Sequence, residues 1–189
     1  AQAEPGEEKQ LELLSRYRGA LLGLAAGDAL GTTLEFRPPG TFEPIKEMVG
    51  GGSFGLEPGQ WTDDTSMALC LAESLVECGA FDARDQMERY VRWWREGHLS
   101  PTGECFDIGG TTADALRRFE QTGDPFSGSR DPHSAGNGSI MRLAPVPMFF
   151  HPDIERAVQY SGEPDTSSTR IQPPSMLVPP RPRLENTLL

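Results

Sequence analysis

The chain has 189 residues, of which 37% are hydrophobic, and carries a formal net charge of −11. This length suffices for one domain with a buried core. The negative charge disfavours nonspecific binding to nucleic acid and to anionic membrane surfaces. The chain contains no long apolar run and its N-terminus shows no apolar signal region, so we expect neither a membrane span nor secretion. The cysteines lack C-x-x-C spacing, which indicates reduced thiols and a cytoplasmic location.

The first predicted helix follows a polar segment, residues 1–10, that we interpret as a solvated leader. Apolar residues then recur every three or four positions over residues 11–30, a spacing typical of a helix. Gly23, Gly27 and Gly31 fall every four residues along it, although each glycine costs a helix about 1 kcal/mol relative to alanine. We therefore expect these glycines to form a smooth face on which another backbone lies close.

A loop rich in proline and glycine is predicted next, over residues 37–60. Its Gly50, Gly52 and Gly55 match the spacing G-x-G-x-x-G. A dinucleotide site needs a helix after these glycines, but the sequence continues with LEPGQ, and the proline and glycine there disfavour one. The glycines therefore indicate a flexible loop rather than a nucleotide fingerprint.

Three further helices are predicted over residues 63–78, 82–97 and 112–122, each with an apolar stripe at helical spacing. Gly79 and Gly123 mark the ends of the first and third. The residues expected to face inward are Ala68, Leu71, Ala72, Leu75 and Val76 in the first, Met87, Tyr90, Val91 and Trp94 in the second, and Ala115, Leu116 and Phe119 in the third.

The last helix is predicted to begin at Pro152, because proline suits the first helical position. Its Ile154, Ala157 and Val158 are expected to face inward. The short apolar segment before it is expected to end at Pro145 and Pro147. No alternating strand pattern persists anywhere, so the fold class is all-α.

The final segment, residues 163–189, differs in composition from the rest of the chain. It holds six prolines, no glycine and no aromatic residue, and no helical or strand period survives in it. Such a segment buries too little apolar surface to offset the entropy of ordering. We therefore expect a folded part over residues 11–162 and a disordered tail over residues 163–189.

Four oxygen-bearing side chains stand at the start of the second predicted helix, in the order Thr62, Asp63, Asp64 and Thr65. A single oxygen suffices to cap a helix, and successive helical residues diverge by about 100°. Two adjacent carboxylates converge only if the turn before the helix directs them to one point, where a hard cation would relieve their repulsion. Oxygen ligands suit magnesium, manganese or calcium rather than zinc. Simple capping remains the alternative.

The segments YRGALLGLAAGDALGTTLEF, WTDDTSMAL, FDIGGTT and AGNGSIMRLAPV occur in this order. Together they resemble the ADP-ribosylglycohydrolases over about residues 16–162. The resemblance implies an all-α bundle of orthogonally packed helices and a dinuclear magnesium centre, with manganese as a substitute. Thr62, Asp63 and Asp64 match the first half of that metal site.

The resemblance also implies roles for individual acidic residues. Glu35 matches a glutamate that lies over the metals and assists the substrate, with a surface acid at a helix end as the alternative. Asp107 matches an aspartate that positions substrate or water, and Asp63 or Asp107 is expected to orient the attacking water. Asp28 is either a second-layer residue of the site or a helix-packing residue. The substrate-binding positions implied by the resemblance are Gly109, Asn137, Gly138, Ser139 and Met141.

The implied function is magnesium-dependent hydrolysis of the bond between ADP-ribose and its acceptor, on a modified protein or a small conjugate. The family completes its metal centre with a G-D-x-D-[TS] motif, which residues 151–189 do not contain. We therefore expect an incomplete second metal site and impaired hydrolysis. A non-catalytic relative that binds ADP-ribose, or a structural protein like the crystallin members, remains the alternative. The sequence leaves the acceptor open.

Overall fold

The computed structural model describes residues 5–129, 131 and 136–162, and helices dominate this part of the chain. The all-α prediction is confirmed, since the β structure of the described residues amounts to one isolated bridge between Gly51 and Leu56. No helix in these ranges has both the length and the apolarity needed to cross a membrane. The elements in chain order are α1 (Pro5–Gly31), η1 (Thr32–Leu34), η2 (Gly52–Phe54), α2 (Asp63–Cys78), α3 (Ala83–Glu96), α4 (Gly110–Thr122), α5 (Gly138–Met141), α6 (Pro145–Phe150) and α7 (Ile154–Gly162).

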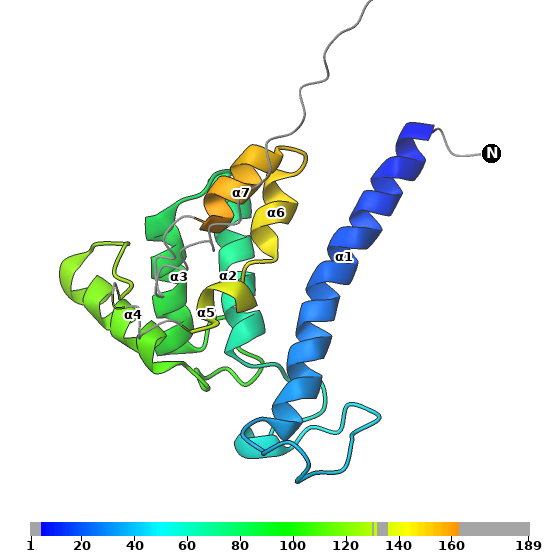
Figure 1. Ribbon diagram of the computed structural model, residues 1–189. Helices are drawn as coiled ribbons and strands as arrows, with labels where there is room; N and C mark the ends of the chain where they lie inside the picture. The colour runs from blue at the N-terminus through cyan, green and yellow to red at the C-terminus, as the bar shows by residue number, and fades with distance from the viewer. Residues whose placement is uncertain (1–4, 130, 132–135, 163–189) are drawn as a thin grey trace, which may run out of the picture.

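The core forms around α2, which contacts α1, α3, α5 and α6. Figure 1 shows α3 and α4 on one side of α2 and α6 and α7 near its C-terminal end. Burial of these apolar side chains is the main source of stability, at about 25 cal/mol per Å² removed from water. The fully or nearly fully buried apolar residues of this cluster are Met67, Cys70, Leu71, Leu75, Met87, Tyr90, Trp93, Leu116, Phe119, Val146 and Phe150.

The predicted ends of the central helices agree with the structure. Asp82 caps α3, because its Oδ1 accepts hydrogen bonds from the backbone N–H of Arg84 and Asp85 at 2.9 and 3.0 Å. Gly79, at the end of α2, has φ +64°, and Gly123, at the end of α4, has φ +71°. These left-handed conformations favour glycine and end a helix sharply.

Several inward-facing assignments were wrong. Val76, Ile154 and Val158 are 74%, 75% and 66% exposed. In α3 the deeply buried tryptophan is Trp93, whereas Trp94 is only half-buried. Helical spacing identifies a stripe but not its edges, since the neighbouring elements decide which edge is covered.

Three further helix boundaries differ from the expectation. The last helix, α7, begins at Ile154 rather than at Pro152, which lies in the turn before it. The segment containing Pro145 and Pro147 is a helix, α6, that begins at Pro145 rather than ending there, as suits a proline in the first turn. At the other end of the chain, α1 begins at Pro5, so part of the expected leader is helical. The predicted tail, residues 163–189, lies outside the described residues.

The glycine row of α1 does not fulfil its expected role within the described residues. A Cβ atom added at Gly23, Gly27 or Gly31 would meet nothing within 4 Å. In Figure 1, α1 stands to one side of the other helices and approaches α2 mainly near its C-terminal end. The prediction that another backbone lies against these glycines is therefore wrong for this part of the chain.

The joint between α1 and α2 depends on the carboxylate of Asp28. Asp28 Oδ1 accepts hydrogen bonds from the N–H and hydroxyl of Thr62, at 3.0 and 2.8 Å. Asp28 Oδ2 accepts from the N–H and hydroxyl of Thr65, at 3.0 and 2.6 Å. The first turn of an α-helix leaves its N–H groups without partners, so Asp28 caps α2 from another helix. Of the two roles considered for Asp28, helix packing is the one that these contacts support.

We predict that Asp28→Ala lowers the free energy of unfolding by about 2 kcal/mol, because it leaves the N–H groups of Thr62, the N-cap of α2, and of Thr65, in its first turn, without an acceptor. Urea unfolding would measure the loss, with and without magnesium. Asp114→Ala is the matched control, since Asp114 forms an exposed ion pair with Arg117, and it should change stability by less than about 0.5 kcal/mol. Equal losses in the two variants would contradict the capping role.

Candidate functional site

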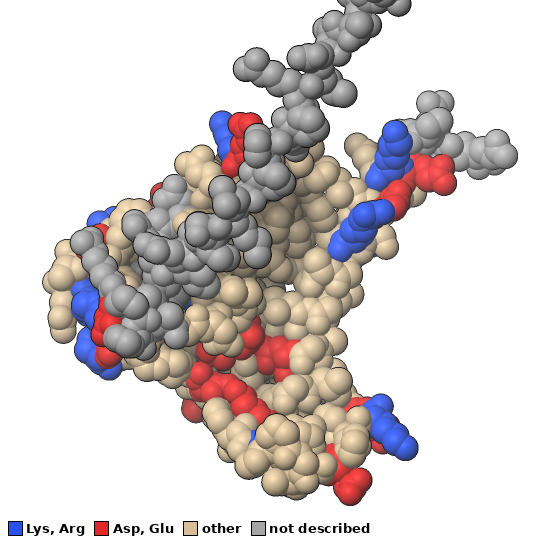
Figure 2. Space-filling view, viewed as in Figure 1, with Lys and Arg blue, Asp and Glu red and all other residues tan. Residues whose placement is uncertain are grey.

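Carboxylates from three separate segments come together beside the joint of α1 and α2. We name Glu35, Asp63, Asp64 and Asp107 the acid cluster. Glu35 follows η1, Asp63 and Asp64 form the first turn of α2, and Asp107 precedes α4. Figure 2 shows acidic side chains gathered between the loop at the foot of α1 and the body built on α2 and α4. The structure therefore brings together the sequence-predicted metal and catalytic residues.

Glu35 is positioned by a tight turn rather than by a flexible loop. Gly52 lies directly against η1, because an added Cβ would stand only 2.6 Å from the carbonyl oxygen of Thr32. The hydroxyl of Thr33 donates to the carbonyl oxygen of Gly50 at 3.1 Å. Gly50 and Gly52 have φ of +66° and +69°, where side chains are strained. Gly50 and Gly52 thus let this loop pack closely against η1. The loop was expected to be flexible, and these contacts correct that expectation.

Asp107 occupies a strained backbone position that directs it towards Glu35. Its φ is +59°, a left-handed value that is uncommon for residues other than glycine, asparagine and aspartate. The negative charge of Glu35 lies close enough to raise the pKa of Asp107. The adjacent Phe106 contacts Phe54 of η2, with ring centroids 5.4 Å apart. The loop before α4 is therefore attached to the same turn that braces η1.

The acid cluster has an excess of negative charge, which raises the pKa of three of its members. Burial, followed by the charges of Asp107 and Asp64, raises the pKa of Asp63 to about 8. Burial and then the charge and hydrogen bond of Glu35 raise the pKa of Asp107 to about 7. Burial and then the charges of Asp28 and Glu35 raise the pKa of Asp64 above its ordinary value. Desolvation and like charges both disfavour the ionised form.

The donor atoms of the cluster suit a hard cation. Asp63 and Asp64 provide carboxylates, and the hydroxyl of Thr62 lies 3.3 Å from Asp63 Oδ1 while it donates to Asp28. Within the described ranges, no three His, Cys, Asp or Glu side chains are close enough to hold a metal by themselves. Magnesium is commonly bound through one or two carboxylates and keeps several waters. The residues present therefore fit magnesium by donor type and charge, though not as a closed cage.

The expected substrate-binding residues fall into two places. Gly109 is the N-cap of α4, two positions after Asp107, and so adjoins the acid cluster in sequence. Asn137 is the N-cap of α5, which contains Gly138, Ser139 and Met141. The structure brings α5 against α2, but the side chain of Ser139 lines a separate cavity beside α6 and α7.

The end of α5 is anchored by Arg142, the residue that directly follows it. Arg142 is 2% exposed, and its contacts include the Sδ atom of Met67 at 3.7 Å and the ring of Tyr90, 5.1 Å from its guanidinium carbon. These contacts fix α5 on α2 and α3. The position of Asn137 at the start of α5 is therefore set by a buried cation, which stacks on an aromatic ring.

Sequence reasoning missed two features of this region. The cap of α2 by Asp28 could have been suspected from Thr62 and Thr65, which lie one turn apart and present hydroxyls to one side. Gln86 of α3 is 3% exposed, although it is polar. Gln86 directly precedes Met87 and lies one turn before Tyr90, so it stands at the edge of the apolar stripe of α3. This position could have predicted its burial.

Comparison with known proteins shows similarity to one family. The family model of the ADP-ribosylglycohydrolases matches residues 9–172. The ADP-ribosylarginine hydrolase Tri1 of Serratia proteamaculans is 47% identical over 165 residues, which are 87% of this chain and 44% of that protein. Tri1 of Pseudomonas putida is 54% identical over 73% of this chain and 37% of its own length. The ADP-ribosyl-[dinitrogen reductase] glycohydrolase of Rhodospirillum rubrum is 38% identical over 74% of this chain and 47% of its own length.

A solved structure, described as an ADP-ribosylglycohydrolase-related protein complex, matches with a TM-score of 0.68 and 47% identity. The match covers 83% of this chain and 50% of that one. The chain thus spans half or less of the length of these relatives. A family model that covers most of the chain, a helical fold and relatives of this identity lead to one conclusion: the chain belongs to the ADP-ribosylglycohydrolase family.

Proposed function

We propose that this chain contributes the acid cluster of a magnesium-dependent hydrolase that removes ADP-ribose from an acceptor. The observation that carries the proposal is the gathering of Glu35, Asp63, Asp64 and Asp107 in one place, where burial and mutual repulsion raise the pKa of three of them. Perturbed carboxylates of this kind concentrate at functional sites. The hydrolase names of the relatives support the reaction class.

In this proposal Thr62, Asp63 and Asp64 hold the cation at the N-terminus of α2. When bound, magnesium would polarise oxygen atoms and offset the negative charge of the cluster. Asp28 leaves Asp63 and Asp64 available for this role, because it satisfies the first turn of α2 itself. Manganese, which prefers similar oxygen ligands, would substitute for magnesium.

Asp107 and Glu35 would position the attacking water and exchange its proton. The pKa of Asp107, raised to about 7 by burial and then by the charge of Glu35, suits a group that exchanges a proton near neutral pH. In the hydrolysis, a water oxygen bonds to C1″ of the distal ribose while the bond from C1″ to the acceptor breaks. Asp107 or Asp63 accepts a proton from the water, and this proton is passed on to the acceptor as it leaves, so that water supplies OH to C1″ and H to the acceptor. Carboxylates near C1″ stabilise the positive charge that develops there.

Arginine-linked ADP-ribose is the first substrate to test. The relatives named ADP-ribosylarginine hydrolases are 47% and 54% identical to this chain. The N-terminal residues of α5, Asn137, Gly138 and Ser139, are the proposed contacts for the distal ribose and phosphates, together with Met141 of the same helix and with Gly109, which follows Asp107 of the acid cluster. N–H groups at a helix start favour anionic groups.

A non-catalytic, ADP-ribose-binding role is the second candidate. It is favoured by the absence of three convergent metal ligands in the described part of the chain. Binding of ADP-ribose without release of ADP-ribose from ADP-ribosylarginine would support this second role. Absence of both binding and release would refute both candidates.

We predict that the chain binds magnesium weakly, with a dissociation constant on the order of 10⁻⁴ M or higher, and that Asp63→Asn abolishes this binding. Titration calorimetry measures both, and Asp114→Asn on the exposed side of α4 is the matched control. Unchanged magnesium affinity in Asp63→Asn would leave this residue without a metal role.

For the reaction itself, release of ADP-ribose from ADP-ribosylarginine should be slow, should require magnesium, and should disappear in Asp107→Asn.

We also predict that, in chelator, the stability of the chain falls as pH rises from about 4 to about 8. The folded state keeps a proton on Asp63 up to a pKa of about 8, whereas the unfolded state releases it near the ordinary value of 3.8. The folded state therefore binds more protons in this window, which gives the slope its negative sign. Urea unfolding across the window measures the slope, and Asp63→Asn should reduce it, while Asp107, whose pKa is raised to about 7, supplies part of what remains. A slope that persists unchanged in Asp63→Asn would show that Asp63 does not cause it.

A further inference from the structure

The residue that follows Glu35 and the residue that precedes Asp107 are both phenylalanines. Phe36 is 72% exposed and has φ +62°, a left-handed value that is an outlier for a bulky side chain. Phe106 is half-buried, and the Asp107 that follows it has φ +59°. Backbone strain persists only where surrounding contacts hold it, and it is concentrated at functional sites. Both segments therefore leave ordinary backbone geometry directly beside their carboxylates.

A third phenylalanine, Phe54 of η2, joins these two segments. Its ring is nearly perpendicular to that of Phe36, with centroids 6.2 Å apart and an interplanar angle of 73°. The ring of Phe106 is tilted by 53° against that of Phe54, with centroids 5.4 Å apart. Both spacings fall in the range in which aromatic pairs attract each other. Phe54 thus bridges two segments that are distant in the sequence.

Phe54 is itself held on a closed turn. Two backbone hydrogen bonds between Gly51 and Leu56, at 2.7 and 2.9 Å, close the chain around η2. Leu56 is 7% exposed, so one end of this turn is buried. Gly52, at the start of η2, lies directly against the backbone of η1. The ring of Phe54 can therefore move only if the whole turn moves with it.

The carboxylates of Glu35 and Asp107 need such a fixed point. The charge of Glu35 lies close enough to disfavour the ionised form of Asp107, so the two groups repel each other. A repelling pair stays together only if other contacts of its two segments oppose the repulsion. The ring contacts of Phe54 oppose it, because they act on the residues adjacent to the two carboxylates.

We propose that Phe54 is a positioning residue that sets how closely Glu35 and Asp107 approach each other. It does so through ring contacts with their neighbours, Phe36 and Phe106. This role rests on the proposed hydrolase function, in which the two carboxylates position the attacking water. A misplacement of about 1 Å can slow an enzymatic reaction by a factor of about 100, so a small shift of these segments has a large effect.

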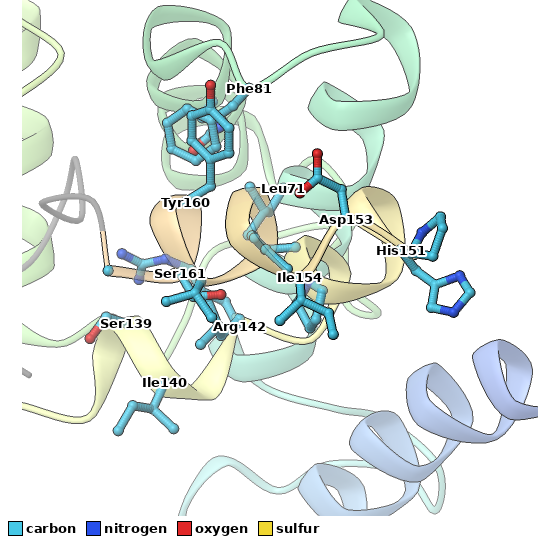
Figure 3. A pocket seen from close by; sticks show the side chains of 18 of the residues that line it. Leu71, Phe81, Ser139, Ile140, Arg142, His151, Asp153, Ile154, Tyr160 and Ser161 are labelled. Carbon is cyan, nitrogen blue, oxygen red and sulfur yellow. The ribbon is translucent and has the colours of Figure 1, made fainter. Parts of the chain in front are cut away.

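A matched aromatic contact lies elsewhere in the fold and provides the control. Figure 3 shows the rings of Phe81 and Tyr160 against each other at the cavity beside α6 and α7, and their centroids are 4.8 Å apart. Phe81 is half-buried, as Phe54 is. The described residues that line this cavity include no member of the acid cluster. Phe81→Ala therefore removes a comparable ring contact without touching the site.

The placement of the two carboxylates can be measured without catalysis. We introduce Glu35→Cys and Asp107→Cys into the full chain and link the pair with a short bifunctional thiol reagent. The native thiols that are not fully buried are first removed by Cys78→Ser and Cys105→Ser. The rate of cross-linking then reports how closely the two positions are held, because proximity raises the effective concentration of one thiol at the other.

The ring of Phe54 should control this rate. Phe54→Ala should slow the cross-linking by about tenfold, whereas Phe54→Tyr, which keeps the ring, and Phe81→Ala should each change it less than about twofold. A purely structural role of Phe54 would lower the stability to urea and leave the cross-linking unchanged. Unchanged cross-linking in Phe54→Ala, or an equal slowing in Phe81→Ala, would therefore overturn the proposal.

Hydrolysis gives a second readout in the chain that keeps both carboxylates. In the release of ADP-ribose from ADP-ribosylarginine with magnesium, Phe54→Ala should lower kcat by about tenfold or more and change KM less than about twofold. Phe54→Tyr should restore kcat. If the unmodified chain releases no ADP-ribose, the proposed hydrolysis fails, while the cross-linking still decides whether Phe54 places the two carboxylates.

Discussion

The carboxylate of Asp28 is the contact on which the arrangement of the site depends. It binds the N–H and hydroxyl groups of Thr62 and Thr65, and so joins the end of α1 to the start of α2. Since η1 follows α1 directly, the same contact determines where Glu35 lies relative to α2. It also explains why two aspartates can follow Thr62: neither is needed as the cap.

Two opposing electrostatic effects act on the ionised carboxylates of the acid cluster. The N-terminus of α2 favours negative groups through the helix dipole, typically by 0.3–1 kcal/mol for each charge. Burial and mutual repulsion act more strongly in the opposite direction, as the raised pKa values of Asp63 and Asp107 indicate. Such a cluster is stable only with protons or a cation, and this requirement is the physical basis of the proposed magnesium site.

The sequence predicted those parts of the fold that local chemistry determines. The ends of α2 and α3 follow from Asp82 and Gly79, whose capping roles need no distant partner. Among the site residues, adjacent aspartates are visible in the sequence, but their proximity to Glu35 and Asp107 depends on loops whose paths no local rule determines. The exposure of Val76 and Ile154 could not be predicted either, because helical spacing does not show which elements cover a stripe.

Asp28 also affects the electrostatics of the site. Its carboxylate accepts hydrogen bonds from the N–H and hydroxyl groups of Thr62 and Thr65. Hydrogen bonds to a carboxylate strengthen as the local dielectric falls, so the partial burial of Asp28 strengthens the contact that holds α1 on α2. Besides burial, the negative charge of Asp28 also contributes to the raised pKa of Asp64 and of Asp107. One side chain therefore links the position of Glu35, which follows α1, to the protonation of the acid cluster.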